Sequence, residues 1–253
     1  MIELLNITLA FGNRTLLESA STRFERGTMT ALVGRNGTGK STLLRAIARL
    51  GECRLGEILI EGRSIHAMSA VELARKVAFV NTERIDVEAL TAYDLVAIGR
   101  APYTNWMGQL TERDKAQVEH ALQVTGVSHL AKRNVETLSD GECQRVMIAR
   151  ALAQDTPIIL LDEPTAFLDL PNRYELCSLL RRLAKEENKL VIFSTHELDI
   201  ALGLSDSVAL IDTPELRHMP TNEMIYSGYI EQLFNGEQLT FDPATCSMRL
   251  QQR

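Results

Sequence analysis

The feature that most constrains this chain is a glycine-rich stretch, GRNGTGKS, which runs from Gly34 to Ser41. Glycine has no Cβ atom, so the three glycines of this stretch let the backbone bend back and turn several N–H groups toward one point. An apolar strand is expected over 28–33, and a helix rich in Leu, Ile and Ala is expected over 41–50. Anions bind well where such a loop meets a helix N-terminus, so the pattern G-x-x-x-x-G-K-[ST] predicts a phosphate-binding loop.

The polar residues of this loop have separate expected roles. Lys40 would reach the β- and γ-phosphates of a nucleotide, and the hydroxyl of Ser41 would bind Mg²⁺. The alternative is an ordinary glycine-rich turn, but the flanking strand, the helix and the Lys-Ser-Thr run disfavour it. The residues expected to contact the nucleotide here are Gly34, Arg35, Asn36, Gly37, Thr38, Gly39, Lys40, Ser41 and Thr42.

A second candidate for phosphate chemistry lies far downstream. The apolar run at 158–161 predicts a strand buried on both faces of a parallel sheet, and two carboxylates, Asp162 and Glu163, follow it at once. Neighbouring residues on a strand point in opposite directions, so each acid is expected to have its own task. Asp162 would support Mg²⁺, and Glu163 would orient and polarise an attacking water.

Composition excludes several broad classes of protein. The 253 residues have 45% hydrophobic and 24% charged residues, as expected for a globular chain, and a net charge of −6 argues against a general nucleic-acid binder. The N-terminal residues lack the pattern of a signal peptide, and no apolar run has the roughly 18–20 residues that a membrane span needs. The four cysteines have no metal-binding spacing, which fits a reducing compartment.

Four further motifs give the chain a resemblance to the ATP-binding cassette family over almost its whole length. LSDGECQR at 138–145 resembles the signature motif of the family, and AFLDL at 166–170 resembles its D-loop. VIFSTHE at 191–197 resembles the strand that ends in the switch histidine. Phe11 lies 29 residues before Lys40 and is similar to the aromatic residue that stacks on adenine.

The resemblance implies a fold and an activity. The fold would be an α/β P-loop NTPase cassette: a RecA-like core with a mixed, mainly parallel sheet, an N-terminal antiparallel β-subdomain and an inserted α-helical subdomain. A single domain would span 1–253, with its core at 1–83 and 151–253 and its helical subdomain at about 84–150. The activity would be hydrolysis of ATP with Mg²⁺, and the implied catalytic residues are Lys40, Glu163 and His196.

The signature motif implies that two copies of the chain work together. Ser139 would open a helix over 141–153, and in the family this end binds the ATP held by a second cassette, so a head-to-tail homodimer is expected. Ser139 and Glu142 also fit a helix capping box, and both interpretations can hold in turn. Asp140 replaces a glycine of the motif and Glu142 replaces its glutamine, which affects the expected affinity for nucleotide. The residues implied to bind ATP outside the loop are Phe11, Ser139, Gly141, Glu142 and Asp169.

A glutamine that the family places near Mg²⁺ is missing from this chain. The strand expected at 76–80 is followed by Asn81, Thr82 and Glu83. Thr82 is short and would act through a bridging water, whereas the longer, anionic Glu83 could approach the metal itself. Both remain candidate metal-site residues.

The helical segment points to the kind of transporter. A helix ending near Gly99 and a second one capped by Thr111 flank a loop that carries Trp106, which would either bind a partner or pack locally. This segment resembles cassettes that energise uptake of iron–siderophore complexes, haem and vitamin B12. The resemblance implies separate transmembrane permease subunits with a periplasmic or surface substrate-binding protein, a place at the cytoplasmic face of the inner membrane, and no nucleic-acid partner. The alternatives are an exporter or other ABC system, and, less favoured by the acidic charge, a soluble cassette acting on nucleic acid.

Overall fold

A six-stranded sheet forms the centre of the protein. The computed structural model describes residues 1–81, 87–166, 168–233 and 239–250. In the sheet order β10-β9-β3-β8-β7-β6, the pairing of β10 with β9 is antiparallel and the other four pairings are parallel. The strands are β3 (Met29–Gly34), β6 (Val77–Val80), β7 (Ile158–Leu161), β8 (Leu190–Thr195), β9 (Ser207–Asp212) and β10 (Glu215–Pro220). Every residue of β3, β7 and β8 is buried, because both faces of the sheet are covered.

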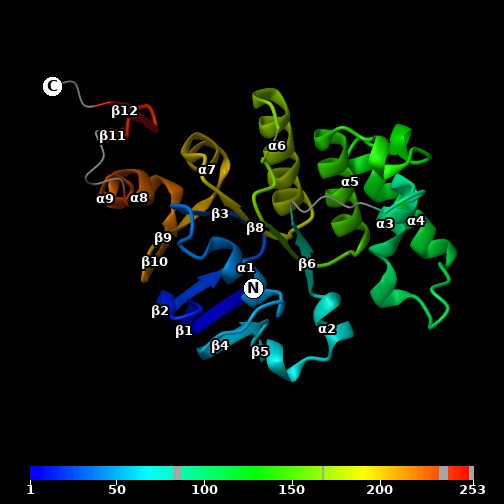
Figure 1. The fold of residues 1–253 in the computed structure, drawn as a ribbon, viewed down its shortest axis with the longest axis horizontal. Coiled ribbons are helices and arrows are strands. Elements are labelled where there is room, and N and C mark those ends of the chain that lie inside the picture. The colour runs from blue at the N-terminus through cyan, green and yellow to red at the C-terminus, as the bar shows by residue number, and fades with distance from the viewer. Residues whose placement is uncertain (82–86, 167, 234–238, 251–253) are drawn as a thin grey trace.

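An antiparallel sheet covers one of these faces together with the helix α1. Its order is β2-β1-β4-β5, and it shares a hydrophobic core with the helix α1 and with alternate residues of the central strands, such as Leu32, Leu160 and Ile192. The bounds are β1 (Ile2–Phe11), β2 (Arg14–Phe24), β4 (Leu55–Ile60), β5 (Arg63–Ser64) and α1 (Lys40–Ile47). Figure 1 shows this sheet, in blue and cyan, below the central strands.

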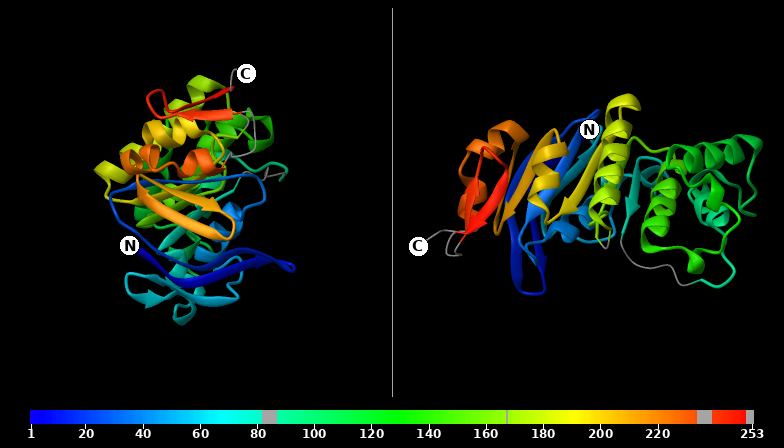
Figure 2. Two further views of the ribbon diagram at one scale, coloured as in Figure 1. Left: turned by 90° about the vertical axis from the view of Figure 1, so that its left-hand side faces the viewer. Right: turned by 90° about the horizontal axis from the view of Figure 1, so that it is seen from above.

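Helices cover the opposite face and extend beyond one edge of the sheet. The other set of alternate strand residues, which includes Val33, Leu161 and Phe193, packs against them in a second core. A short helix, α2 (Ala70–Ala74), instead contributes Leu73 to the first core. The helices on this face and beyond the edge are α3 (Ala92–Ile98), α4 (Glu112–Val124), α5 (Asp140–Ala153), α6 (Leu170–Glu186), α7 (Leu198–Leu204), α8 (Thr221–Tyr226) and α9 (Tyr229–Leu233). Figure 2 shows α3, α4 and α5 as a separate group beside the β6 edge.

Capping residues set the ends of the helical group. The side chains of Thr91 and Thr111 accept hydrogen bonds from the backbone N–H groups of Asp94 and Asp114, and each pair completes a capping box. The predicted cap at Thr111 is therefore confirmed. The mixed central sheet, the antiparallel N-terminal sheet and the helical insertion are also confirmed, whereas the domain bounds near residues 84 and 150 stay a prediction.

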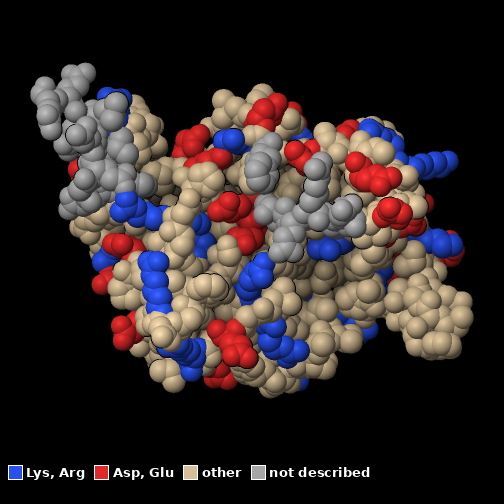
Figure 3. Space-filling view, in the orientation of Figure 1, with Lys and Arg blue, Asp and Glu red and all other residues tan. Residues whose placement is uncertain are grey.

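The remaining elements are short. A hairpin of β11 (Leu239–Asp242) and β12 (Ser247–Leu250) follows α9, and single turns of 3₁₀ helix lie at Ile65–Ala67, Ala101–Tyr103, Ser128–Leu130 and Val135–Thr137. Within the described ranges, no helix combines the length and the apolar character needed to cross a bilayer. On the face seen in Figure 3, basic and acidic side chains are interspersed.

Candidate active site

The glycine-rich loop joins β3 to α1 as the sequence predicts. Gly37 and Gly39 have φ angles of 76° and 106°, in the left-handed region that glycine enters without strain. Gly34 is required for a different reason, because a Cβ atom there would lie 2.7 Å from the carbonyl oxygen of Ile211 and from the hydroxyl of Thr38. The loop is therefore held closely against β9.

Lys40 lies folded back over this loop. Its Nζ donates to the carbonyl oxygens of Gly34 at 2.8 Å and Arg35 at 3.1 Å, and the residue is only 5% exposed. Burial lowers the pKa of the Lys40 ammonium below its ordinary value, and the carboxylates of Glu163 and Asp162 offset part of that effect. The ammonium is thus fixed where it can meet anionic oxygens bound by the loop.

A cavity of about 550 Å³ opens over the loop, within the range usual for small-molecule sites. Phe11 is 77% exposed at the end of β1, so its ring is available to stack on a flat ligand. Glu163 and His196 reach the same cavity from the ends of β7 and β8. The lining residues are Phe11, Arg14, Leu16, Asn36, Gly37, Gly39, Lys40, Ser41, Thr42, Glu163 and His196.

Two of these lining residues, Arg14 and Leu16, were missed by the sequence analysis. They follow Phe11 across a two-residue turn, and the first residue pair of the β1–β2 hairpin is Phe11 with Arg14. The dipeptide Gly12–Asn13 between two alternating runs is a hairpin signal that would have placed them beside the ring.

The two acids after β7 do not follow the expected strand alternation. The strand ends at Leu161, and Glu163 has a φ of 48°, so the backbone has already turned at this residue. The idea that Asp162 and Glu163 diverge because they are strand neighbours is therefore wrong. Glu163 lies in the cavity wall, at a left-handed turn of the backbone. Asp162, in contrast, continues the pairing of the sheet, because its N–H donates to the carbonyl oxygen of Val80.

Asp162 also meets the start of α1. The hydroxyl of Ser41 donates to Oδ1 of Asp162 at 2.9 Å, across 121 residues of sequence. A hydroxyl and a carboxylate in contact beside a phosphate-binding loop are the oxygen donors that a small divalent cation prefers. In the described ranges no group of three or more His, Cys, Asp or Glu could hold a metal ion.

The signature residues lie away from this cavity. Ser139 caps α5, where its hydroxyl accepts from the N–H of Glu142 at 3.3 Å and the Glu142 carboxylate accepts from the N–H of Ser139 at 2.8 Å. The bond from the Ser139 backbone is the main reason that the pKa of Glu142 is lowered. This is the capping-box arrangement that the sequence predicts. Ser139, Gly141, Glu142 and Asp169 do not line the cavity of their own chain.

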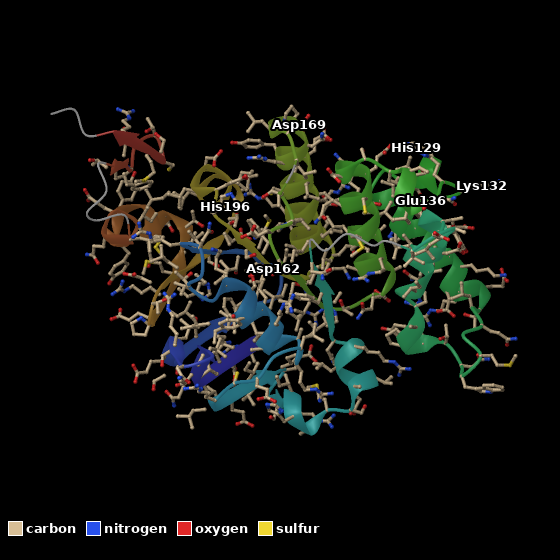
Figure 4. All side chains as sticks on the ribbon, in the orientation of Figure 1. His129, Lys132, Glu136, Asp162, Asp169 and His196 are labelled. Atoms are coloured by element: carbon tan, nitrogen blue, oxygen red, sulfur yellow. The ribbon has the colours of Figure 1, made fainter. Side chains whose placement is uncertain are left out.

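Asp169 has a comparable local role at another helix. Its Oδ1 accepts from the N–H of Asn172 at 3.1 Å and caps α6. Figure 4 shows Asp162 and His196 near the centre of the molecule, Asp169 at the tip of α6, and the segment before the signature, with His129 and Glu136, farther to the side. The structure therefore brings together the glycine-rich loop, Phe11, both acids and His196, and leaves Ser139, Gly141, Glu142 and Asp169 outside this group.

Two predicted metal-site residues, Thr82 and Glu83, lie outside the described residues. The strand that precedes them, β6, ends at Val80. Trp106 is 92% exposed, so of the two alternatives for this residue local packing is wrong. Its neighbour Met107 is 59% exposed, and the loop therefore presents an apolar surface.

Comparison with known proteins gives the family. A profile of the ABC transporter family matches residues 17–166. The achromobactin transport ATP-binding protein CbrD of Dickeya dadantii is 38% identical over 90% of this chain and 86% of its own length. The petrobactin import ATP-binding protein YclP of Bacillus subtilis is 36% identical over 93% of this chain and 93% of its own length.

Solved structures agree with this result. An ABC transporter of proposed metal-chelate type, in an inward-facing conformation, superimposes with a TM-score of 0.82 and 28% identity over 92% of this chain and 88% of its own. The dimeric cassette MJ0796 bound to ADP and phosphate has a TM-score of 0.75 and 27% identity over 87% of this chain and 99% of its own. With the phosphate loop, Glu163 and His196 meeting in one cavity, this chain belongs to the ABC transporter family and is an ATP-hydrolysing subunit of it.

Proposed function

We propose that this chain energises the uptake of an iron chelate, haem or cobalamin by a membrane importer. The observation that carries its ATPase role is the single cavity that joins the Lys40 loop, Glu163 and His196. The choice of cargo is supported by its relatives, whose names include achromobactin transport, petrobactin import and, in Halobacterium salinarum, cobalamin import. That last relative is 39% identical over 82% of this chain but only 51% of its own length.

Each side chain in the cavity has a task in phosphoryl transfer to water. Phe11 stacks on the adenine ring, and the buried ammonium of Lys40 offsets the negative charge of the terminal phosphates. Glu163 orients the attacking water and polarises it, while His196 donates to the terminal phosphate. A Mg²⁺ ion held by Ser41 and supported by Asp162 would supply further charge neutralisation.

The chain acts as a head-to-tail homodimer in this proposal. Ser139, Gly141, Glu142 and Asp169 do not line their own cavity, although Ser139 lies at the N-terminus of a long helix, where anions bind well. In a two-fold dimer each of these surfaces meets the nucleotide of the other chain, and Ser139 exchanges its capping bond for a phosphate contact.

A separate transmembrane permease is the proposed membrane partner, and it works with a periplasmic or surface substrate-binding protein. The apolar loop with Trp106 and Met107 supports this assignment, as does a second cavity of about 780 Å³ lined in part by Leu50, Ile98 and Pro102. Docking there would hold the chain at the cytoplasmic face of the cell membrane. Thr82 or Glu83 remains a predicted link to the Mg²⁺ site.

Replacement of Glu163 by glutamine tests the ATPase role, because it keeps the size of the side chain but removes the charge that polarises water. Glu163→Gln should bind ATP normally, accumulate as an ATP-dependent dimer and hydrolyse ATP at least 100-fold more slowly. The exposed Glu223 on α8 supplies a matched control, since Glu223→Gln should behave as wild type. Near-normal hydrolysis by Glu163→Gln would reject this role for the acid.

Uptake measurements test the cargo. Cells that express the chain with its permease should accumulate ⁵⁵Fe from a siderophore complex, or labelled haem or cobalamin, and Glu163→Gln should abolish that accumulation. Loss of efflux with unchanged uptake would identify an exporter instead.

A further inference from the structure

Ser194 is a buried polar residue that follows the four apolar residues at the start of β8. It lies on β8, two residues before His196, and is 0% exposed. β8 is the strand between β3 and β7, so the backbone on both sides of Ser194 is paired within the sheet. A buried hydroxyl needs hydrogen-bond partners, because a polar group without them costs free energy in the interior.

The partners of this hydroxyl are the two acids of the active site. The backbone N–H of Glu163 donates to Oγ of Ser194 at 2.8 Å, and Oγ donates in turn to Oδ1 of Asp162 at 2.7 Å. The hydroxyl of Ser194 thus donates one hydrogen bond and accepts another, and both partners are the adjacent residues Asp162 and Glu163. Oδ1 of Asp162 accepts from Ser41 as well, so one oxygen atom joins the metal-binding hydroxyl to Ser194.

The bond to the Glu163 N–H acts at a strained point of the backbone. Glu163 has a φ of 48°, a conformation that is unfavourable for a residue with a side chain, and it precedes Pro164, which adds its own restriction. Such a conformation persists only where the surroundings fix it. Two hydrogen bonds fix the backbone of Glu163. Its N–H donates to the hydroxyl of Ser194, and its carbonyl oxygen accepts from the N–H of Ala166 at 3.0 Å.

We infer that Ser194 is a positioning residue for ATP hydrolysis, which fixes the turn that presents Glu163 and holds Asp162 in register with it. This inference rests on the proposed role of Glu163 in polarising water. The hydroxyl has no contact with substrate, since Ser194 is buried beneath the cavity and is absent from its wall. Its effect reaches the reaction through the position of the Glu163 carboxylate, and small displacements of a reacting group are costly to rate.

Ser194→Ala tests the inference, because a positioning role predicts a change in kcat and almost none in KM. Loss of the hydroxyl should lower kcat by about 10- to 100-fold, while KM for ATP and the affinity for a non-hydrolysable ATP analogue change less than twofold. Ser194→Thr keeps a hydroxyl and should recover part of kcat. Ser207→Ala is the matched control, because Ser207 lies on β9, beyond β3 in the same sheet, and bonds to Thr30 and His218 rather than to the acids. Its kcat should match wild type.

A second measurement separates positioning from general stability. In single-turnover assays with labelled ATP, Ser194→Ala should cost little further rate when it is added to Glu163→Gln, because both changes remove the same function. An equal cost in both backgrounds would overturn the inference. So would a wild-type kcat in Ser194→Ala while Glu163→Gln alone is inactive, a result that leaves the proposed function intact.

Failure of the proposed function would look different, since Glu163→Gln itself would then hydrolyse ATP. If Ser194→Ala does not fold, Ser194→Cys decides the question. The thiol has nearly the volume of the hydroxyl but is a weak hydrogen-bonding group, so the positioning role predicts a lowered kcat at unchanged KM. A wild-type kcat in folded Ser194→Cys would overturn the inference.

Discussion

Replacement of Asp114 by alanine is expected to destabilise the helical group strongly. Its carboxylate accepts from Nε of Arg100 at 2.8 Å and, through its other oxygen, from the N–H and hydroxyl of Thr111 at 2.9 and 2.6 Å. Both charged side chains are only 5% exposed. Arg100 also donates to the carbonyl oxygen of Ala153 and lies 4.0 Å from the ring centroid of Tyr103, so it stays in place when its partner is removed.

The magnitude follows from what Asp114→Ala leaves behind. A buried guanidinium without its carboxylate costs about 3 kcal/mol or more, and loss of the capping bonds to Thr111 adds about 1 kcal/mol. We therefore expect the free energy of unfolding to fall by about 4 kcal/mol. Addition of Arg100→Met should restore part of this loss, because the unpaired buried charge is then gone.

Urea denaturation followed by circular dichroism measures this change as a shift in midpoint. Glu112→Ala is the matched control: Glu112 begins the same helix, its side chain is 90% exposed, and its pair with Lys115 contributes less than about 0.5 kcal/mol. A loss below about 1 kcal/mol for Asp114→Ala would refute the reasoning. The hydrogen bond from the Thr111 hydroxyl is the main cause of the lowered pKa of Asp114. The contribution of the ionised carboxylate to the free energy of unfolding is therefore present above the ordinary pKa of 3.8 and is lost as the pH falls below that value.

Three further predictions concern exposed and polar groups. Trp106→Ala should change the free energy of unfolding by less than about 0.5 kcal/mol and leave ATP binding intact, yet weaken co-purification with the permease, because the side chain is 92% exposed. Phe11→Ala should raise the Kd for ATP about tenfold, measured by calorimetry, through loss of ring stacking worth roughly 1–3 kcal/mol, whereas Phe11→Trp should retain affinity. Burial lowers the pKa of His218, so protons favour the unfolded chain. Unfolding free energy, measured across pH, should therefore fall below about pH 6.5 in wild type and show a smaller slope in His218→Gln.

Local sequence signals predicted elements whose cause is itself local. The four apolar residues at 158–161 predict β7 with its observed bounds, since a parallel strand covered on both faces needs an unbroken apolar run. Thr111 followed by Asp114 predicts the start of α4, because both members of a capping box lie within one turn. The loop from Gly34 to Ser41 likewise has its strand and its helix next to it in sequence.

The turn at Glu163 could not be predicted in this way. A residue before proline favours an extended backbone, so local preference points away from the observed φ of 48°. The bond that opposes this preference comes from Ser194, 31 residues later, on a strand whose position depends on the whole sheet. Exposure of Trp106 is a similar case, because composition alone does not show whether a nearby core has room for its ring.

The dipeptide Gly99–Arg100, at the C-terminal end of α3, is fixed by close packing against α5. Gly99 has a helical φ of −56°, so it needs no conformational freedom. What it needs is space, because a Cβ atom there would lie 2.3 Å from the carbonyl oxygen of Arg150 on α5. Arg100 then reaches further along the same helix to Ala153. These contacts connect the start of the loop that carries Trp106 to the C-terminal end of α5. The opposite end of α5 is capped by Ser139. The proposed permease contact and the proposed phosphate contact of the partner chain therefore share one helix.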